Sequence, residues 1–380
     1  MPWQEVSTVS LRKEFVSMAT QPGANVSQLC RGFQISRKTA YKWLGRYEAE
    51  GMSALADHSR RPEHSPVRTP REVETAIVRL RKKHPDWGAR KLIRRLRELG
   101  HAALPGPSTA QAILKRNGLI APEQSAKHQA FVRFEHAYPN SLWQMDFKGH
   151  FALSAGGRCH PLTVLDDHSR FNLAIRACAN ERRDTVQEQL SGLFRRYGLP
   201  DSIGVDNGAP WGDSFEHPYT ALVLWLIRQQ IRVWHSRPYH PQTLGKNERF
   251  HRTLKTELLA RTHLKDLPSA QRAFDSWREL YNIERPHEAL DGDTPATHYR
   301  PSPRRFCEQP APIEYAADCQ VRKVDQDGHF SFKGRSLRIG KAFHGYPIGL
   351  RPTTEDGVWE VHFCHQKIKS IDLRNSNSLT

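Results

Sequence analysis

Apolar and polar residues alternate with a period of two along residues 142–148. Trp143, Met145 and Phe147 are apolar, whereas Gln144 and Asp146 are polar. This alternation predicts a strand over 142–153 whose apolar side chains share one sheet face and whose polar side chains share the other. Similar patterns predict strands at 161–166, 172–178, 202–206 and 231–235, and helices at 182–197 and 219–229. Three hairpin-linked strands followed by alternating helices and strands indicate a mixed α/β core.

Residues 1–55 have the pattern of a helix-turn-helix unit. The segment 32–35 supplies the turn, and Ser36 is a good N-cap for a helix toward Tyr47. We expect its inner face to hold Ala40, Tyr41 and Leu44. Its outer face carries the cations Arg37, Lys38, Lys42 and Arg46. Because recognition helices present such residues to the major groove, DNA binding is favoured over a three-helix bundle with a solvated face.

A second helical pattern covers residues 71–125, after a proline-containing basic linker at 56–70. In the linker, Arg60 and Arg61 are suited to a minor groove or, more simply, to phosphates. We expect the inner side of the helix after Gly88 to hold Leu92, Ile93, Leu96 and Leu99. Its outer side carries Arg90, Lys91, Arg94, Arg95 and Arg97. The pattern indicates a second helix-turn-helix, with a basic spacer that touches only phosphates as the alternative.

Residues 310–375 change character. Short alternating runs are separated by glycine and charged turns, and Asp327-Gly328 and Lys333-Gly334 are hairpin signals. We predict a small C-terminal β-barrel there, which either supports DNA contact or assembly or only stabilises the chain. The predicted fold class is therefore multidomain α/β.

The charge of the chain favours a polyanionic partner. The net charge is +17, and residues 1–120 hold 22 Lys and Arg against 10 Asp and Glu. The six cysteines show no Cys-x-x-Cys spacing, which argues against a zinc site or a disulfide framework. No signal peptide or transmembrane-length apolar run is evident. We expect a cytoplasmic, nucleoid-associated protein with no membrane partner.

Three acidic residues are candidates for one metal site. Asp146 lies on the first strand, and Asp206 closes the strand 202–206 before an Asn-Gly turn. Glu248 lies on a helix whose buried stripe is Phe250, Leu254 and Leu258. It shares the opposite face with Arg252 and Lys255, at i+4 and i+7. Three converging carboxylates suit Mg²⁺ or Mn²⁺, although a single acid at a strand end is usually solvated.

Several segments together resemble the DDE transposases of bacterial insertion sequences, which have a retroviral-integrase-type core. The matching segments are Trp143–Phe147, Leu165–Phe171, Val205–Gly208, His240–Lys255 and Tyr281–Leu290. The resemblance implies a ribonuclease-H-like core at 136–300 with a mixed five-stranded sheet. It assigns the catalytic, metal-binding triad to Asp146, Asp206 and Glu248, and leaves Asp166 and Asp167 outside it. One departure is the gap of 41 residues between Asp206 and Glu248, which is longer than usual.

The resemblance implies a transposase that binds the terminal inverted repeats of its element, cleaves DNA and transfers the freed strand. It implies two Mg²⁺ ions per site, with Mn²⁺ as a substitute, double-stranded DNA as partner, and a homodimer or larger assembly. Gln242, Thr243, Gly245 and Lys246 are expected to form a mobile loop before the catalytic helix. His240 and His251 are either bases or ligands, or contact substrate and pack locally. A nuclease with the same core and a DNA-binding regulator with an inert core are the alternatives.

Overall fold

The computed structural model describes residues 7–57, 68–120, 136–212, 218–236 and 245–374. The chain divides into two compact units between Arg68 and Thr69. Across the described ranges, every helix is too short or too polar to traverse a lipid bilayer.

The first unit contains the predicted helix-turn-helix. Its helices are α1 Thr8–Ala19, α2 Val26–Gly32 and α3 Arg37–Glu50, followed by a 3-10 turn, Gly51–Leu55. The Ser36 hydroxyl accepts the amide of Thr39, which confirms the predicted N-cap of α3. Gln34 has a left-handed φ of 53°, so the turn lies where it was predicted.

One inward residue of α3 was predicted wrongly. Tyr41 is 62% exposed, and Trp43 is buried in its place. The two residues lie on nearly opposite sides of the helix, and Trp43 joins Ala40 in the cluster that Phe15 and Val16 of α1 form. The guanidinium of Arg12 covers the Trp43 ring at 4.0 Å, so a cation closes this small core.

The second unit begins with three helices: α4 Arg71–Lys83, α5 Ala89–Glu98 and α6 Pro107–Arg116. Leu92, Ile93 and Leu96 are buried in their common core, as predicted. Leu99 is 55% exposed, which contradicts the prediction, because α5 ends at Glu98 and Leu99 lies beyond its packed face.

The outer face of α5 contacts the end of the core rather than lying fully in solvent. Arg94 forms an ion pair with Asp293, and Arg95 pairs with Glu284 at 3.1 Å. Burial lowers the pKa of Lys91 to about 8, with Arg285 acting in the same direction and Glu257 opposing it. The periodicity of α5 alone did not indicate these partners, which lie far away in sequence.

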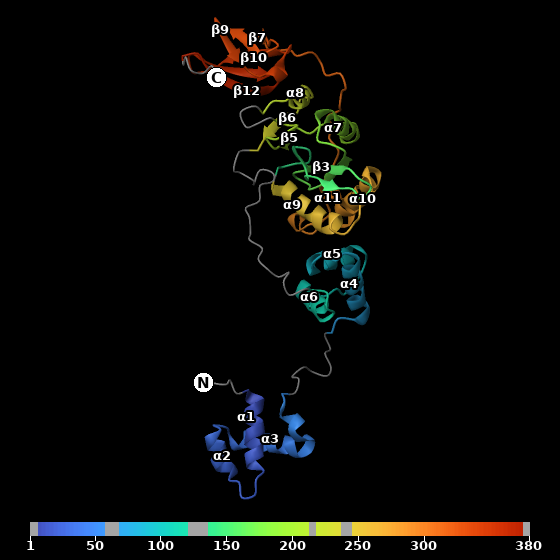
Figure 1. Ribbon diagram of the computed structural model, residues 1–380, viewed down its shortest axis with the longest axis vertical. Coiled ribbons are helices and arrows are strands. Elements are labelled where there is room, and N and C mark those ends of the chain that lie inside the picture. The colour runs from blue at the N-terminus through green and yellow to red at the C-terminus, as the bar shows by residue number, and fades with distance from the viewer. Residues whose placement is uncertain (1–6, 58–67, 121–135, 213–217, 237–244, 375–380) are drawn as a thin grey trace. The chain divides into compact units, whose positions relative to one another are not determined.

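The core contains a six-stranded sheet in the described residues (Figure 1). Its strands are β1 Leu142–Phe147, β2 Phe151–Ala152, β3 Arg158–Asp166, β4 Asn172–Cys178, β5 Ser202–Val205 and β6 Arg232–His235. Antiparallel pairing joins β4 to β3 and β3 to β1, and parallel pairing joins β1 to β5 and β5 to β6. These five strands form the predicted mixed sheet, to which the short β2 adds on β3.

Helices cover both faces of the sheet. The first helix pair is α7 Arg183–Tyr197 and α8 Ala221–Arg228, and the second is α9 Gly245–Leu254 and α10 Leu267–Glu279. The first pair packs with Trp143 and Met145 in one cluster, whereas the second packs with Leu165 and Ile175 in another. The alternation along β1 therefore has the predicted effect: its apolar residues face α7 and α8, and its polar residues face α9.

Two π-helical segments extend the second helix pair. One, Lys255–Leu259, follows α9, and the other, Leu280–Glu284, follows α10. Glu257 in the first forms a 2.9 Å ion pair with Arg285, which directly follows the second. The two side chains are only 9% and 10% exposed, so this pair is buried. Short turns Glu288–Leu290 and α11, Pro295–His298, complete the core.

Of the two predicted C-terminal hairpins, only the one at Lys333-Gly334 joins strands that pair with each other. Residues 320–372 contain six strands. They are β7 Gln320–Lys323, β8 His329–Phe332, β9 Arg335–Arg338, β10 Pro347–Pro352, β11 Val358–Phe363 and β12 Gln366–Asp372, with a 3-10 turn at Lys341–Phe343. Lys333 and Gly334 both have positive φ, as a tight hairpin between β8 and β9 requires.

The predicted barrel is not closed. Among residues 245–374, β12, β11, β10 and β7 form one sheet and β8 pairs only with β9. The carbonyl of Gly328, just before β8, accepts hydrogen bonds from the backbone amides of Ile339 and Gly340, just after β9. These bonds hold the start of β8 next to the end of β9 rather than next to β7. The β8–β9 hairpin packs on the sheet through the rings of Phe332 and Trp359, whose centroids are 4.9 Å apart.

The C-terminal domain also contacts the edge of the core sheet. The side-chain amide of Gln366 accepts the Val233 amide at 3.0 Å and donates to the Val233 carbonyl at 3.1 Å. Since β6 is the last strand of the sheet, this glutamine occupies the hydrogen-bonding positions that another strand would use.

Candidate active site

Asp146 and Asp206 lie side by side on the face of the sheet that α9 covers. In the parallel pairing of β1 and β5, Gln144 lies opposite Gly204. Two residues further along both strands, the same register places Asp206 beside Asp146. Neighbouring strands are about 4.8 Å apart, so the sheet itself brings together two carboxylates that are 60 positions apart in sequence.

Each carboxyl group is harder to ionise than a free one. Burial and the nearby charge of Asp206 raise the pKa of Asp146 to about 7. Burial also raises the pKa of Asp206, against the amide of Gly208 and the nearby His235. The negative charge of a neighbouring carboxylate acts on Asp146 in this way. A bound divalent cation would reverse that effect.

The turn after β5 fixes Asp206. Its Oδ1 accepts the backbone amide of Gly208 at 3.1 Å. A Cβ at position 208 would lie 3.3 Å from the carboxylate, so a side chain there would press on it. The Asn-Gly dipeptide that signalled a turn in the sequence therefore also leaves room for the Asp206 carboxylate.

The structure adds a fourth acid that the sequence did not single out. The charge of Glu181 contributes to the raised pKa of both Asp146 and Asp206. Glu181 lies in the turn that follows β4, and its carboxylate is 2.8 Å from Nδ1 of His160 on β3. No motif marks Glu181, since only the sheet topology brings it near the pair.

His251 packs beneath Asp146. Its Nε2 is 2.7 Å from the hydroxyl of Thr163, and its Nδ1 is 3.9 Å from a carboxylate oxygen of Asp146. Burial lowers the pKa of His251 to about 3, so the ring is neutral. Among the roles considered for His251, this geometry supports local packing. His240 lies outside the described residues.

Glu248 is in the first turn of α9 and is exposed. Its neighbour Asn247 is buried and donates its amide to Gln144 Oε1 at 3.1 Å, next to the pair. Within the described ranges, no three His, Cys, Asp or Glu side chains are close enough to hold one metal ion. The structure thus brings together two of the three predicted acids, Asp146 and Asp206. The third, Glu248, directly follows Asn247, whose backbone amide contacts Gln144 on β1.

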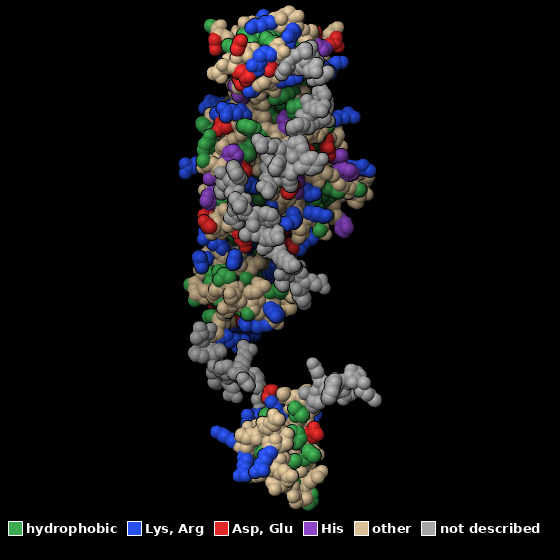
Figure 2. Space-filling model, turned by 90° about the vertical axis from the view of Figure 1, so that its left-hand side faces the viewer, with side chains coloured by type: hydrophobic (Ala, Val, Ile, Leu, Met, Phe, Trp, Pro, Cys, Tyr) green, Lys and Arg blue, Asp and Glu red, His purple; other side chains and the backbone are tan. Residues whose placement is uncertain are grey.

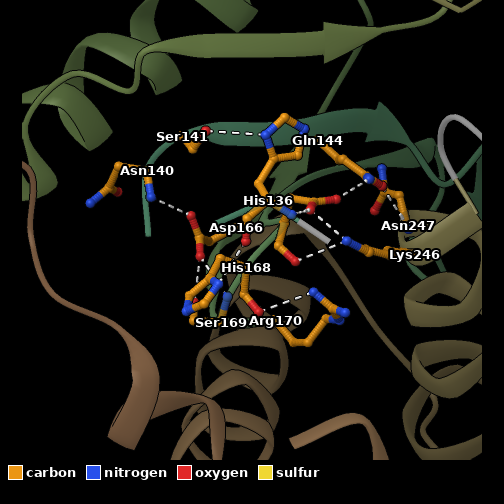
Figure 3. Close-up of polar contacts among 11 residues, drawn as sticks. His136, Asn140, Ser141, Gln144, Asp166, His168, Ser169, Arg170, Lys246 and Asn247 are labelled. Atoms are coloured by element: carbon orange, nitrogen blue, oxygen red, sulfur yellow. Dashed lines mark hydrogen bonds and ion pairs between the residues drawn. The ribbon is translucent and has the colours of Figure 1, made fainter. Parts of the chain in front are cut away.

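Asp166 and Asp167 form a buried network beside this site (Figure 3). Asp166 accepts the amide of Asn140 at 2.7 Å and the hydroxyl of Ser169 at 2.6 Å. Asp167 accepts the side-chain amide of Gln144 and forms an ion pair with Lys246. The expected loop of Gln242, Thr243, Gly245 and Lys246 therefore has two members, Gly245 and Lys246, in the start of α9, and the other two lie outside the described residues.

The candidate DNA-contact residues have different surroundings. Arg37, Lys38 and Lys42 are exposed, Arg46 is half-buried beside Trp43, and Figure 2 shows Lys and Arg side chains gathered on one side of this unit. Arg90, Arg252 and Lys255 are also exposed. Arg94 is held by Asp293 and Glu98. Arg60 and Arg61 lie outside the described residues.

The raised pKa of Asp146 predicts how stability varies with pH. Below about pH 4 the group is protonated in folded and unfolded chains alike, so it has no effect. Between about pH 4 and 7 the unfolded chain ionises first, which favours unfolding. At pH 8 without metal, we therefore expect Asp146→Asn to be more stable than wild type by about 1–2 kcal/mol, allowing for solvent screening.

Thermal melting in EDTA at pH 4, 6 and 8 measures this difference. The gap between the variant and wild type should open as the pH rises and level off above about pH 7. A gap that is largest at pH 4 would contradict the assigned direction.

Family models match almost the whole chain in separate parts. Two models described as integrase core domain match residues 136–241 and 229–295. A helix-turn-helix domain matches 11–63 and a homeodomain-like domain matches 39–114. The C-terminal domain of IS481 family transposases matches 319–379.

Curated relatives come from insertion elements. An IS476 protein of Xanthomonas euvesicatoria is 26% identical over 61% of this chain and 66% of its own length. An IS407 protein of Burkholderia multivorans is 28% identical over 40% of this chain and 53% of its own length. The matches thus span between half and two thirds of these two relatives. A putative IS5376 transposase of Geobacillus stearothermophilus is 22% identical over 92% of this chain and 84% of its own length.

Solved integrases show weaker similarity. The simian T-cell lymphotropic virus intasome matches with 19% identity and a TM-score of 0.37, over 78% of this chain and 99% of the matched chain. The HTLV-2 integrase catalytic core in complex with magnesium has 18% identity and a TM-score of 0.31, and the match covers 43% of this chain and 97% of the matched chain.

Residues 136–295, which contain the sheet and the carboxylate pair, match the integrase core domain. Residues before and after this core match a helix-turn-helix domain and the C-terminal domain of IS481 family transposases. The chain is thus similar to transposases of insertion sequences along most of its length.

Proposed function

We propose that the chain binds the terminal inverted repeats of its element, cleaves DNA at their ends and transfers the freed strand to target DNA. The observation that carries this proposal is the pairing of Asp146 with Asp206 across β1 and β5, in a segment that matches the integrase core. It rests also on the domains around that core, which match DNA-binding and transposase domains.

The residues of the site fit a divalent metal. Two partly buried carboxylates with raised pKa favour a hard cation such as Mg²⁺, or Mn²⁺ in its place. Asp146 and Asp206 would hold it, and Glu248 would complete a site for two ions once its exposed side chain rotates inward from the first turn of α9. When bound, the ions supply an activated attacking oxygen and charge stabilisation at the leaving oxygen.

The chain's own residues then hold and align the DNA. In the first step, water attacks phosphorus at the element end and the bond to the 3′ oxygen breaks, which frees a 3′-hydroxyl. In the second step, this hydroxyl attacks a target phosphodiester and releases a 3′-hydroxyl of the target. Arg252 and Lys255, exposed on the same helix as Glu248, contact the flanking phosphates. Joining two ends requires a dimer or larger assembly.

The helical units recognise the element ends. Helix α3 enters a major groove with Arg37, Lys38, Lys42 and Arg46, and the linker residues Arg60 and Arg61 contact the backbone. Arg90 contacts phosphate directly, and Arg94 does so only by leaving Asp293. The corresponding proposed subdivision is 1–55, 56–70, 71–125, 136–300 and 310–375.

We expect Lys38→Ala and Arg37→Ala to differ in their effects on binding. A phosphate contact by Lys38 would weaken binding to all sequences about equally and reduce the salt dependence by about one charge. A base contact by Arg37 would cost about 1–3 kcal/mol on the element end and much less on unrelated DNA. Titrations of both duplexes at several salt concentrations measure this, and equal losses on both duplexes from Arg37→Ala would exclude base readout.

One assay tests the proposed function. The protein, Mg²⁺, a labelled duplex of the element's own terminus and a plasmid are incubated together, and joined product is measured. Joining supports the proposal, and efficient cutting without joining would indicate a nuclease instead. The exposed position of Glu248 favours a second candidate, a DNA-binding regulator with an inert core. For that candidate, end binding without cutting or joining is expected.

A further inference from the structure

Gln144 joins three elements at the edge of the proposed active site. It is 2% exposed and lies on β1, two residues before Asp146. Its Nε2 donates to Oδ1 of Asp167 at 2.8 Å, and its Oε1 accepts the backbone amide of Asn247 in α9 at 3.1 Å. One side chain thus links β1, the end of β3 and the start of α9.

Asp167 strengthens the same link from the other side. It is 3% exposed, and its Oδ2 accepts the amide of His136 at 3.1 Å and pairs with the ammonium of Lys246. Lys246 also donates to the backbone oxygen of Asp167 at 3.2 Å. Figure 3 shows the Gln144 side chain extending from β1 toward Asn247, and the Lys246 side chain entering the same network from the start of α9.

These contacts act where a helix is least able to hold itself. The first backbone amides of a helix have no acceptor within the helix, and a neighbouring side chain usually supplies one. Here a glutamine 103 positions earlier in the chain supplies an acceptor for Asn247. The Lys246–Asp167 pair holds the preceding residue, so two consecutive residues of the first turn are fixed to the sheet.

We propose that Gln144, Asp167 and Lys246 are positioning residues that fix the first turn of α9 and thereby set the place of Glu248 relative to Asp146. Asn247 directly precedes Glu248, and Gln144 is two residues from Asp146, so the spacing of the two acids depends on this link. The role given to Glu248 rests on the proposed function. The fixing of the helix start does not.

The chain offers a matched control on the neighbouring helix. Gln271 of α10 donates to the carbonyl of Ile175 at 3.0 Å and accepts the amide of Ala177 at 2.9 Å. It therefore joins a helix to the sheet with the same side-chain amide, but on β4, which does not carry the acids. Gln144→Leu and Gln271→Leu remove the same chemistry from the two places.

Hydrogen exchange and Mn²⁺ binding calorimetry on the full chain test the proposal. For Gln144→Leu we expect the amides of residues 247–249 to exchange about tenfold faster, and Mn²⁺ affinity to fall about tenfold. The Mg²⁺ concentration for half-maximal strand transfer should rise similarly. For Gln271→Leu we expect faster exchange at Ala177 and unchanged Mn²⁺ affinity. Lys246→Met should show the same changes as Gln144→Leu, but smaller. Lys246→Arg keeps a cation for Asp167 and should behave like wild type.

Each contrary result has a distinct meaning. Wild-type exchange at 247–249 in both Gln144→Leu and Lys246→Met would overturn the fixing of the helix start. Faster exchange there with unchanged Mn²⁺ affinity, or an equal loss of affinity in Gln271→Leu, would overturn the positioning role. Absence of Mn²⁺ binding by the wild-type protein would overturn the proposed function, and with it the role of Glu248, while the exchange result still judges the link itself.

Discussion

Replacing Asp146 by Asn should reduce both DNA cleavage and strand transfer by at least about a thousandfold, which corresponds to about 4 kcal/mol of transition-state stabilisation. The amide keeps the size of the side chain but removes the negative charge that a divalent cation needs. End binding should stay within about twofold of wild type, because the first helix-turn-helix belongs to a separate compact unit. Gel-based joining assays and binding titrations on the same preparation measure both quantities.

The loss cannot be attributed to unfolding, because this substitution is expected to stabilise the metal-free chain at neutral pH. Asp184→Asn is a matched control, since it removes the same charge from a side chain that is 82% exposed. It should leave joining unchanged. Wild-type-like strand transfer by Asp146→Asn would refute the proposed active site.

Replacing Glu257 by Gln should destabilise the second unit by about 3 kcal/mol, because it leaves Arg285 and Lys91 without their buried counter-charge. The second unit runs from Thr69 to Thr380, so an unfolding entropy of about 2.1 cal/mol/K per residue converts this loss into a fall in melting temperature of about 5 °C. The pKa of Lys91 should fall further below about 8, since Glu257 is one of the charges that raise it. Thermal and urea unfolding measure the change.

An exposed ion pair provides the comparison. Arg195 and Glu308 pair at the surface, with side chains 57% and 67% exposed, so Glu308→Gln should cost less than about 1 kcal/mol. Adding Lys91→Met to Glu257→Gln should recover part of the loss, because one unpaired cation is removed. Equal losses of unfolding free energy from Glu257→Gln and Glu308→Gln would show that the buried ion pair stabilises the unit no more than an exposed one.

Local patterns were sufficient for the strands and for the partition of β1 between two sheet faces. The strand Asn172–Cys178 has the predicted bounds, and the apolar residues of β1 lie in the core as expected. They succeeded because a period of two and the turn residues are properties of neighbouring positions. The pairing of Asp146 with Asp206 needed more, since only the resemblance assigned the two acids to one site.

The errors arise where distant residues decide. The choice between Tyr41 and Trp43 depends on what α1 offers as a packing surface. Arg94 was expected to face outward, and a carboxylate 199 positions later holds it. The start of α9 was expected to be loop, and Gln144 and Asp167 hold it as helix. The exposure of Glu248 likewise follows from tertiary structure, which no periodicity encodes.

The glutamine of β12 that bonds to Val233 has a consequence for truncated forms of the chain. Without residues after about 310, the main-chain groups of β6 that Gln366 satisfies would open to solvent. An open strand margin of this kind is a template on which a second polypeptide adds by backbone pairing. A shortened chain would therefore tend to aggregate through the exposed edge of its sheet. By covering β6, the C-terminal domain prevents this self-association.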